Sequence, residues 1–481
     1  MANNKNIISN FIWRFFERIG AQLVTFVITL VIARILTPED YGTVALITVV
    51  TQFLGVFVDS GLGTALIQKK NADQLDFSTV FYANIGLCLV AYFLLFLTSP
   101  WIADFYGEPE LSLLLRVSGI TLIISGVKNI QQAYVSRNLL FKRFFFSTLG
   151  GTIAAAVVGL VMAWKGFGVW ALVIQSIVNP AMDTLILWIT VKWRPTLEFS
   201  WKRFKELFSF GWKMLVSALL DTVYNKLRQL IIGKLYTTED LAFYNKGEQF
   251  PTLIANNVNT SIDSVLLPVM SEAQDNASQV KDMTRRSIKM SVYIMAPLMM
   301  GMCFVATPMV RLLLTEKWLK SVPFIQIFCI TYMFFPIHTA NLNAIKAMGR
   351  SDLFLKLEII KKINGFLVLF LTMRWGVMAM AYSLFYTELC AQIINSWPNK
   401  KLLNYNYLDQ IKDILPSIVL AVFMGVCVYT VEYLHLNDIV TLGIQIILGA
   451  FIYILGSKIF HFESYEYLCQ VIKNLLKKKR R

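Results

Sequence analysis

Charged and polar residues inside three otherwise apolar segments are the residues of this chain that are best suited to chemistry. In the first two segments they recur at steps of three and four, which places them along one face of a helix, and in the third they form a broad polar stripe. They are Arg14, Arg18 and Gln22 in the first segment, Lys213, Asp221, Asn225 and Arg228 in the second, and Glu248, Gln249 and Asn256 in the third. Arginine and lysine suit phosphate or uronate groups, and amides suit sugar hydroxyls. The set predicts binding of an anionic ligand that is rich in hydroxyls.

The surroundings of these residues decide what they do. A charged side chain at the centre of a bilayer costs about 2.5–3.5 kcal/mol on insertion scales, so such residues face protein or a water-filled cavity. One interpretation pairs them within the helix bundle, Arg14 with Glu17 and Lys213 or Arg228 with Asp221. The other places them around one cavity between two halves of the chain. The three segments contain more polar groups than pairing within the bundle would use, which favours the second interpretation, a shared cavity.

Acidic residues at membrane depth form a second group of candidates. Asp59, Asp183 and Asp263 are candidates for ion or proton coupling, and each is equally suited to act as the counter-ion of a buried base.

Catalytic and metal-binding patterns are missing from the sequence. There is no Gly-rich phosphate loop, no nucleophile elbow and no HExxH motif. The six cysteines and three histidines lie singly, without ligand spacing. We therefore expect no enzyme activity, no cofactor and no metal site. Without an ATP site, any transport must use an ion gradient or the gradient of the substrate itself.

The elements that position these residues are membrane helices. Hydrophobic residues make up 56% of the 481 residues and charged residues only 16%, whereas soluble domains are about 45–50% apolar. A span needs about 20 apolar residues, and the sequence predicts fourteen spans. They centre on 9–35, 42–66, 76–99, 112–135, 143–164, 168–191, 207–235, 244–270, 289–314, 321–345, 357–374, 375–396, 413–434 and 438–459.

Most Lys and Arg residues outside the spans fall in the loops of one side, which predicts that both termini are cytoplasmic. This placement explains the net charge of +15 without a nucleic-acid partner. The basic run at 477–481 is interpreted as a topology anchor or a contact with anionic lipid. The first apolar segment is longer than the core of a signal peptide, so we expect it to stay attached.

Short motifs repeat at an offset of about 200 residues. The segment Arg-Ile-Leu-Thr-Pro-Glu-Asp at 34–40 is echoed by Lys-Leu-Tyr-Thr-Thr-Glu-Asp at 234–240, and Val-Asp-Ser at 58–60 by Ile-Asp-Ser at 262–264. We interpret this as duplication of a six-helix unit. The predicted domains are an N-lobe at 1–200 with spans 1–6, a C-lobe at 201–400 with spans 7–12, and a segment at 401–481 with spans 13 and 14 and a basic tail. Because six is even, the two repeats are parallel.

Four motifs resemble the polysaccharide transporter family. They are Arg-x-Leu-Thr-Pro-Glu-Asp-Tyr-Gly at 34–42, Asp-Ser-Gly-Leu-Gly-x-Ala-Leu at 59–66, Gly-Glu-Pro-Glu-Leu at 107–111 and Ala-x-Gly-Arg-x-Asp at 347–352. That family contains Wzx-type flippases of lipid-linked oligosaccharides and polysaccharide exporters, within a superfamily that includes multidrug exporters of the MATE type. The resemblance covers essentially the whole chain.

The resemblance implies an inner-membrane protein with two MATE-like six-helix lobes around a cationic cavity. It implies transport of oligosaccharides linked to undecaprenyl pyrophosphate for lipopolysaccharide or exopolysaccharide synthesis, with membrane lipids, a polymerase and chain-length machinery as partners. In such relatives, helices 13 and 14 form a groove suited to the polyprenyl tail. The alternatives are an ion-coupled exporter of the MATE type, and a membrane polymerase or glycosyltransferase. The latter would need a large outer loop with catalytic residues, and the loop at 99–111 is short and has no Lys or Arg.

Overall fold

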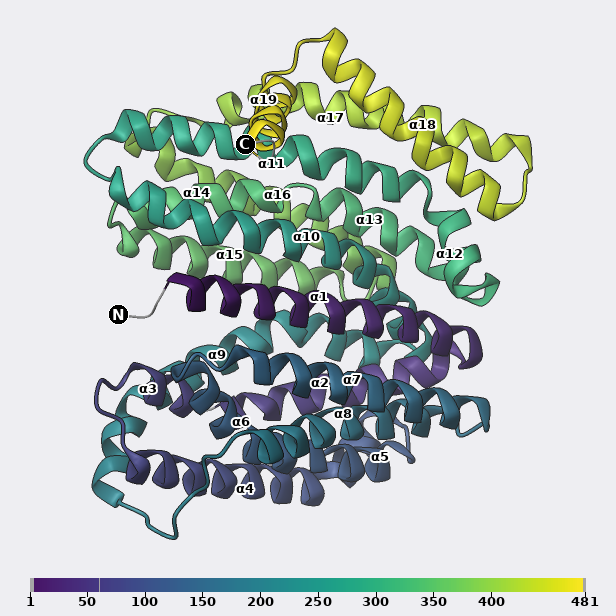
Figure 1. Cartoon of the computed structure of the whole chain (residues 1–481). Coiled ribbons are helices and arrows are strands. Elements are labelled where there is room, and N and C mark those ends of the chain that lie inside the picture. The colour runs from purple at the N-terminus through teal and green to yellow at the C-terminus, as the bar shows by residue number, and fades with distance from the viewer. Residues whose placement is uncertain (1–3, 60, 479–481) are drawn as a thin grey trace. The chain divides into compact units, whose positions relative to one another are not determined.

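The computed structural model describes residues 4–59 and 61–478, and every regular element in these ranges is a helix (Figure 1). The side chains of residues 4–12, 14–18, 59, 210, 471, 472 and 474–478 lie outside that description. By its internal contacts the chain divides into two units, Met1–Ala242 and Phe243–Arg481. The predicted all-α class is confirmed.

The N-terminal unit packs its helices around α7 and α8 on one side and α4, α6 and α9 on the other. Helix α1 lies along α7, and α9 lies along α2, α3 and α4. The helices of this unit are α1 (Asn4–Ile35), α2 (Pro38–Asp59), α3 (Leu62–Gln68), α4 (Gln74–Tyr106), α5 (Leu111–Ser118), α6 (Ile120–Arg137), α7 (Phe141–Trp164), α8 (Val169–Thr190) and α9 (Trp201–Leu235).

The C-terminal unit is centred on α11, which packs against α13, α14 and α17. Helix α17 also packs against α18. The boundary between the units falls inside the first turn of α10. The elements are α10 (Thr238–Glu272), α11 (Ala277–Phe304), α12 (Ala306–Leu314), η1 (Glu316–Ser321), α13 (Val322–Tyr332), α14 (Phe335–Ala347), α15 (Ser351–Thr372), α16 (Val377–Leu402), α17 (Tyr407–Tyr429), η2 (Thr430–Leu434), α18 (Asp438–Ile459) and α19 (Glu463–Lys478).

Each of the fourteen predicted windows coincides with a helical segment, although several of these segments are broken inside. Ten helical segments within the described residues are long and apolar enough to cross a membrane. Helices α1, α9, α10 and α15 are 22 to 35 residues long, and α9 and α10 carry the polar faces that lower their hydropathy. The chain is a multi-pass membrane protein, and the exact number of fourteen crossings stays a prediction.

The predicted lobe boundary at residue 200 differs from the boundary of the contact units. Helix α9 follows that boundary in sequence, yet it packs against α2, α3 and α4 and belongs to the N-terminal unit by contacts. Glycines contribute to the contacts of α9, because Gly233 of α9 lies against Leu46 of α2 and Gly61, just before α3, lies against Gly211 of α9.

The repeated Thr-x-Glu-Asp motif forms the same helix cap twice. The Thr37 hydroxyl donates to the Asp40 carboxylate at 2.8 Å, and the Asp40 amide donates back to the Thr37 hydroxyl at 3.2 Å. Thr237 and Asp240 make the same two bonds at 2.8 and 3.0 Å. The pairs satisfy amides at the starts of α2 and α10 that have no partner inside the helix. The motif is therefore explained by local structure.

A glycine in the first copy lets the two caps meet. A Cβ atom on Gly42 would overlap the backbone of Thr238, including its carbonyl oxygen. In this part of the chain the backbone of α2 therefore lies directly against the first residue of α10, and only glycine fits.

We expect each cap to contribute measurable stability. Replacing Thr37 or Thr237 by alanine removes one hydroxyl that accepts from a helix amide, which costs about 0.5–2 kcal/mol. Thermal unfolding of the purified protein in detergent should show a lower transition for each variant, while Thr→Ser at the same positions should behave like the parent. Unchanged transitions for both alanine variants would contradict the assignment of the caps.

Candidate substrate cavity in the N-terminal unit

A cavity of about 630 Å³ lies between α2, α6 and α9. Glycines allow close contacts with α9 on both sides of the cavity-lining residues, one with α2 and one with the segment just before α3. Gly233 of α9 lies against Leu46, and a Cβ atom on Gly61 would come within 2.7 Å of the Gly211 carbonyl oxygen. Between these contacts the two helices leave space, and α6 closes it on the third side. Its volume is typical of sites for small molecules.

The lining of the cavity is polar and positively charged. The two charged residues in its lining are Lys128 on α6 and Lys226 on α9, and the described lining contains no Asp or Glu. The neutral polar residues are Thr51, Gln52, Thr121, Ser125, Asn129, Gln132, Thr222 and Asn225. Ammonium groups suit anions, and amides and hydroxyls pair with hydroxyl-rich ligands.

Lys128 also forms an ion pair with Asp183, which is not one of the residues that line the cavity. Its ammonium lies 3.1 Å from Oδ2 of Asp183 on α8, and the two side chains are 18% and 7% exposed. The other carboxylate oxygen, Oδ1, is buried and has no hydrogen-bond partner among the described residues. Of the acidic residues that are candidates for ion coupling and whose side chains the structure describes, Asp183 lies beside a partly buried base.

The neighbouring Asn129 stabilises the break between α2 and α3. Gly61 adopts a left-handed conformation with φ of 68° and ends the regular path of α2. The Asn129 side-chain amide donates to the Val58 carbonyl oxygen at 2.8 Å, which supplies a partner near that break. The glycine in the Asp-Ser-Gly-Leu motif thus shapes one end of the cavity.

The polar face predicted on α9 divides among different surroundings. Asn225 lines the cavity, and so does its neighbour Lys226. Lys213 and Asp221 are exposed on α9, and Arg228 is half-buried. Asp221 and Arg228 each have an interaction partner, and the roles of these residues in binding or in pairing stay predictions.

The polar residues predicted on α10 make contacts inside the C-terminal unit. Glu248 accepts a hydrogen bond from the Tyr332 hydroxyl at 2.8 Å, and Gln249 accepts one from Lys246 at 3.2 Å. Asp263 accepts from the Asn343 amide at 2.8 Å. Asn256 is exposed. For these residues a role in substrate binding stays a prediction.

Three predicted residues have side chains outside the described part of the structure: Arg14, Arg18 and Asp59. Gln22 on the same helix as the two arginines is half-buried. Helix α1 packs along α7, for example where the Trp13 and Phe145 rings meet at 5.2 Å between centroids.

Lys128 is recognisable in the sequence only as a base inside an apolar segment, because its partner lies 55 residues away. The signal that is present is the lysine itself, since an unpaired charge is costly at that depth. Gln52 and Gln132 give no such signal, because single amides are common in helices that face protein.

A second cavity, in the C-terminal unit, is a groove of about 1060 Å³ between α17 and α18. Its walls are mainly apolar and include Leu415, Val419, Phe423 and Ile452. The charged residues in its lining are Lys289, Lys412, Asp413 and Glu463, of which Lys289 and Glu463 form an ion pair. The resemblance implied a lipid-facing groove formed by these two helices, and binding of a polyprenyl tail in the groove seen here stays a prediction.

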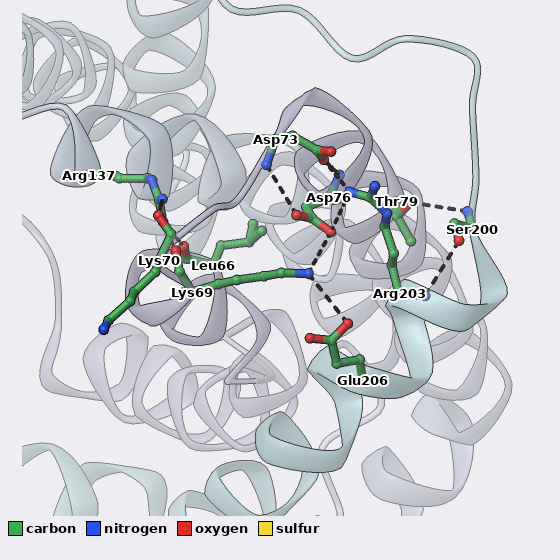
Figure 2. A network of polar contacts seen from close by, with 10 residues as sticks. All are labelled: Leu66, Lys69, Lys70, Asp73, Asp76, Thr79, Arg137, Ser200, Arg203 and Glu206. Atoms are coloured by element: carbon green, nitrogen blue, oxygen red, sulfur yellow. Dashed lines mark hydrogen bonds and ion pairs between the residues drawn. The ribbon is translucent and has the colours of Figure 1, made fainter.

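Elsewhere in the N-terminal unit, a charged cluster ties the start of α9 to the α3–α4 turn (Figure 2). Lys69 lies 3.0 Å from Asp76 and 3.5 Å from Glu206. Arg203 binds both Asp73 and Asp76, the latter at 3.1 Å. We call these five residues the α9 clasp.

Two further contacts reinforce the clasp. The Arg137 guanidinium donates to the backbone oxygens of Leu66 and Lys70 at 2.6 and 2.8 Å (Figure 2).

The hydrogen bond from Arg203 lowers the pKa of the Asp73 carboxyl to about 2. Because this pKa is depressed, the stabilisation from Asp73 is present at neutral pH and is lost only as the pH falls through about 2. Asp73 therefore keeps its negative charge throughout the physiological range.

Comparison with known proteins identifies a family and relatives that this chain resembles. A family model described as "Polysaccharide biosynthesis protein" matches residues 31–323. The chain is 24% identical over 457 residues to the teichuronic acid biosynthesis protein TuaB of Bacillus subtilis (strain 168), across 94% of this chain and 95% of that protein.

Two solved structures share the fold. The lipid II flippase MurJ in an inward closed conformation aligns with a TM-score of 0.75 at 15% identity, over 94% of this chain and 99% of that one. An inward-facing multidrug resistance MATE family transporter of the MOP superfamily aligns with a TM-score of 0.65 at 14% identity, over 80% and 94%. The predicted MATE-like membrane fold, and the prediction of a transporter rather than an enzyme, are confirmed.

Proposed function

The chain belongs to the polysaccharide biosynthesis protein family, and from that premise we propose that it is a flippase for oligosaccharides linked to undecaprenyl pyrophosphate. It moves these units across the bacterial inner membrane during synthesis of a surface polysaccharide. The observation that carries the proposal is the cavity between α2, α6 and α9, whose lining combines two lysines with eight neutral polar residues. That combination suits a saccharide that carries negative charge.

The proposed mechanism is alternating access of two lobes. The saccharide occupies the polar cavity, where ammonium groups and amides replace the water that it leaves. The polyprenyl tail stays beside the protein in the apolar groove between α17 and α18. A flippase of this kind needs no covalent step, and the gradient of an ion or of the substrate supplies the driving force.

The proposed orientation follows the distribution of basic residues. Both termini are cytoplasmic, and the α9 clasp, the α3–α4 turn and the basic tail lie on that side. A polymerase and chain-length machinery on the outer side take over the delivered units.

The runner-up is ion-coupled export of small cationic compounds, by analogy with the multidrug resistance MATE family transporter that shares the fold. The cavity argues against it, because Lys128 and Lys226 would repel a cation and the described lining offers no carboxylate. At 14% identity the likeness to that transporter concerns the fold alone.

Deletion of the gene tests the proposed function. The deletion strain should accumulate lipid-linked oligosaccharide on the cytoplasmic face and lose its surface polysaccharide. The intact chain and a variant at an exposed lysine outside the cavity, Lys165→Gln, should both restore export. Normal export in the deletion strain, with no paralogue present, would contradict the proposal.

A further inference from the structure

The segment between α8 and α9, residues 191–200, exposes large apolar side chains although it lies outside the helices. We call this segment the connector. Leu197 is 96% exposed, Phe199 is 41% exposed, and Trp201, the first residue of α9, is 68% exposed. Single exposed apolar side chains are normal on a protein surface, whereas a group of them marks a surface that meets another molecule or a membrane. We call these three side chains the apolar tip.

Hydrogen bonds hold the start of the connector in place. The indole of Trp193 is buried, and its N–H donates to the Gln74 side chain at 2.7 Å. The Gln74 amide donates in return to the Arg194 carbonyl oxygen at 2.6 Å, and the Gln131 amide donates to the Trp193 carbonyl oxygen at 3.1 Å. Because these bonds satisfy and fix a backbone that has no helical partners, the apolar tip stays on the outside of the unit.

The depth of the connector follows from the two helices to which it is attached. It begins directly after Thr190, the last residue of α8. Further along, the Thr196 amide donates to the Ser78 hydroxyl at 2.9 Å, and the Ser200 amide donates to the Thr79 hydroxyl at 3.2 Å (Figure 2). Helices α4 and α8 are both long and apolar enough to cross a membrane. The connector therefore lies level with their ends, where hydrocarbon gives way to lipid headgroups and where tryptophan is enriched.

The charged residues beside the apolar tip are mainly basic. Residues 192–206 contain five Lys or Arg residues and two Glu residues. Lys192, Lys202 and Lys205 are exposed and form no hydrogen bond or ion pair with another described residue. We call them the connector lysines. Two of them share one face of α9 with Trp201. Lysine stems lie along apolar surface while their ammonium groups reach the headgroups, and anionic lipids attract them.

We propose that the connector and the first turn of α9 form an anchor on the surface of the membrane. The apolar tip lies in the boundary layer between hydrocarbon and headgroups, and the connector lysines bind the headgroups of anionic lipids. The start of α9 is then held on one side by lipid and on the other by the α9 clasp. This inference goes beyond the proposed function and does not depend on it.

Fluorescence quenching by lipid tests the depth of the apolar tip in proteoliposomes that contain the full chain. The partly exposed cysteines, Cys390, Cys427 and Cys469, are first replaced by serine, and a fluorophore is attached at Leu197→Cys. Because Leu197 is 96% exposed, the label disturbs no packing. Lipids with a spin label near the top of the acyl chain should quench this fluorophore strongly. They should quench the same fluorophore only weakly at Asn71→Cys, an exposed position in the α3–α4 turn.

A second measurement with the label at position 197 tests the connector lysines. In a mixed bilayer, phosphatidylglycerol brominated on its acyl chains should quench more strongly than brominated phosphatidylcholine at the same mole fraction. The preference should be about fivefold or more, the value expected from one lysine beside an anionic headgroup. Exchange of all three connector lysines for glutamine should abolish it. The matched control, Lys400→Gln with Lys401→Gln, removes two exposed lysines at the end of α16 and should leave the preference unchanged.

Three results would overturn the anchor. Equal quenching at positions 197 and 71 by the spin-labelled lipid would place the connector in water, where the apolar tip would instead be free to meet a protein. Equal quenching by the two brominated lipids would refute binding of anionic headgroups, and a preference that survives exchange of the connector lysines would refute their role. None of these measurements requires transport, so each result leaves the flippase function intact, whereas a chain that shows the anchor and moves no substrate would contradict only the proposed function.

Discussion

Replacing Lys128 by methionine is expected to lower the stability of the protein by about 3–5 kcal/mol, because it leaves the Asp183 carboxylate buried without its cation. The carboxylate is already short of partners, since Oδ1 makes no hydrogen bond among the described residues. The effect should appear as a large fall in the unfolding temperature of the purified protein in detergent.

The control for this prediction removes both charges. Lys128→Met combined with Asp183→Leu replaces the pair by apolar side chains, and such replacements are often neutral or stabilising. The double variant should therefore recover most of the lost stability, although its cavity has lost one cation. A double variant as unstable as the single one would show that the ion pair is not the source of the effect.

Replacing Gly42 by valine is expected to have the second large effect, about 3 kcal/mol or more, at the upper end of the usual penalty for overpacking. The new side chain would overlap the backbone of Thr238. A backbone cannot turn aside as a flexible side chain does, so α2 and the start of α10 would have to separate. Unfolding temperature and yield in the membrane fraction measure the result.

Gly86→Val is the matched control for that substitution. Gly86 lies inside α4 in the same unit, and a Cβ atom there meets nothing within 4 Å. The same amino acid should therefore be tolerated at Gly86 and not at Gly42. Similar behaviour of the two variants would mean that the close approach at Thr238 does not limit stability.

Much of the fold could be predicted because each apolar segment is bounded by polar loops. All fourteen predicted windows correspond to helical segments, and the duplicated Thr-x-Glu-Asp motif proved to be a duplicated helix cap. The internal breaks were not foreseen. The break between α2 and α3 depends on the left-handed Gly61 and on the Asn129 amide, which comes from 71 residues further along the chain. An apolar run does not reveal such tertiary support.

For the candidate cavity, the sequence indicated the chemical character of the lining better than it indicated which residues form that lining. A cationic and amide-rich face on α9 was expected, and Asn225 with Lys226 lines the cavity. The contribution of α6 was missed, because Lys128 stands alone in its sequence segment and gains its meaning from Asp183 on another helix. The sequence marks Asp183 as suited to be a counter-ion or a coupling residue, and the structure shows the counter-ion contact. Coupling at Asp183 stays a prediction.

The central claim is that this protein moves a lipid-linked oligosaccharide between the leaflets of a membrane. The most direct test reconstitutes the purified chain into liposomes that hold a fluorescent saccharide on undecaprenyl pyrophosphate in both leaflets, and then adds a membrane-impermeant quencher. We predict that the fluorescence protected in the inner leaflet of protein-free vesicles becomes accessible when the protein is present. If the protected fraction stays the same with folded protein as without it, the account is contradicted.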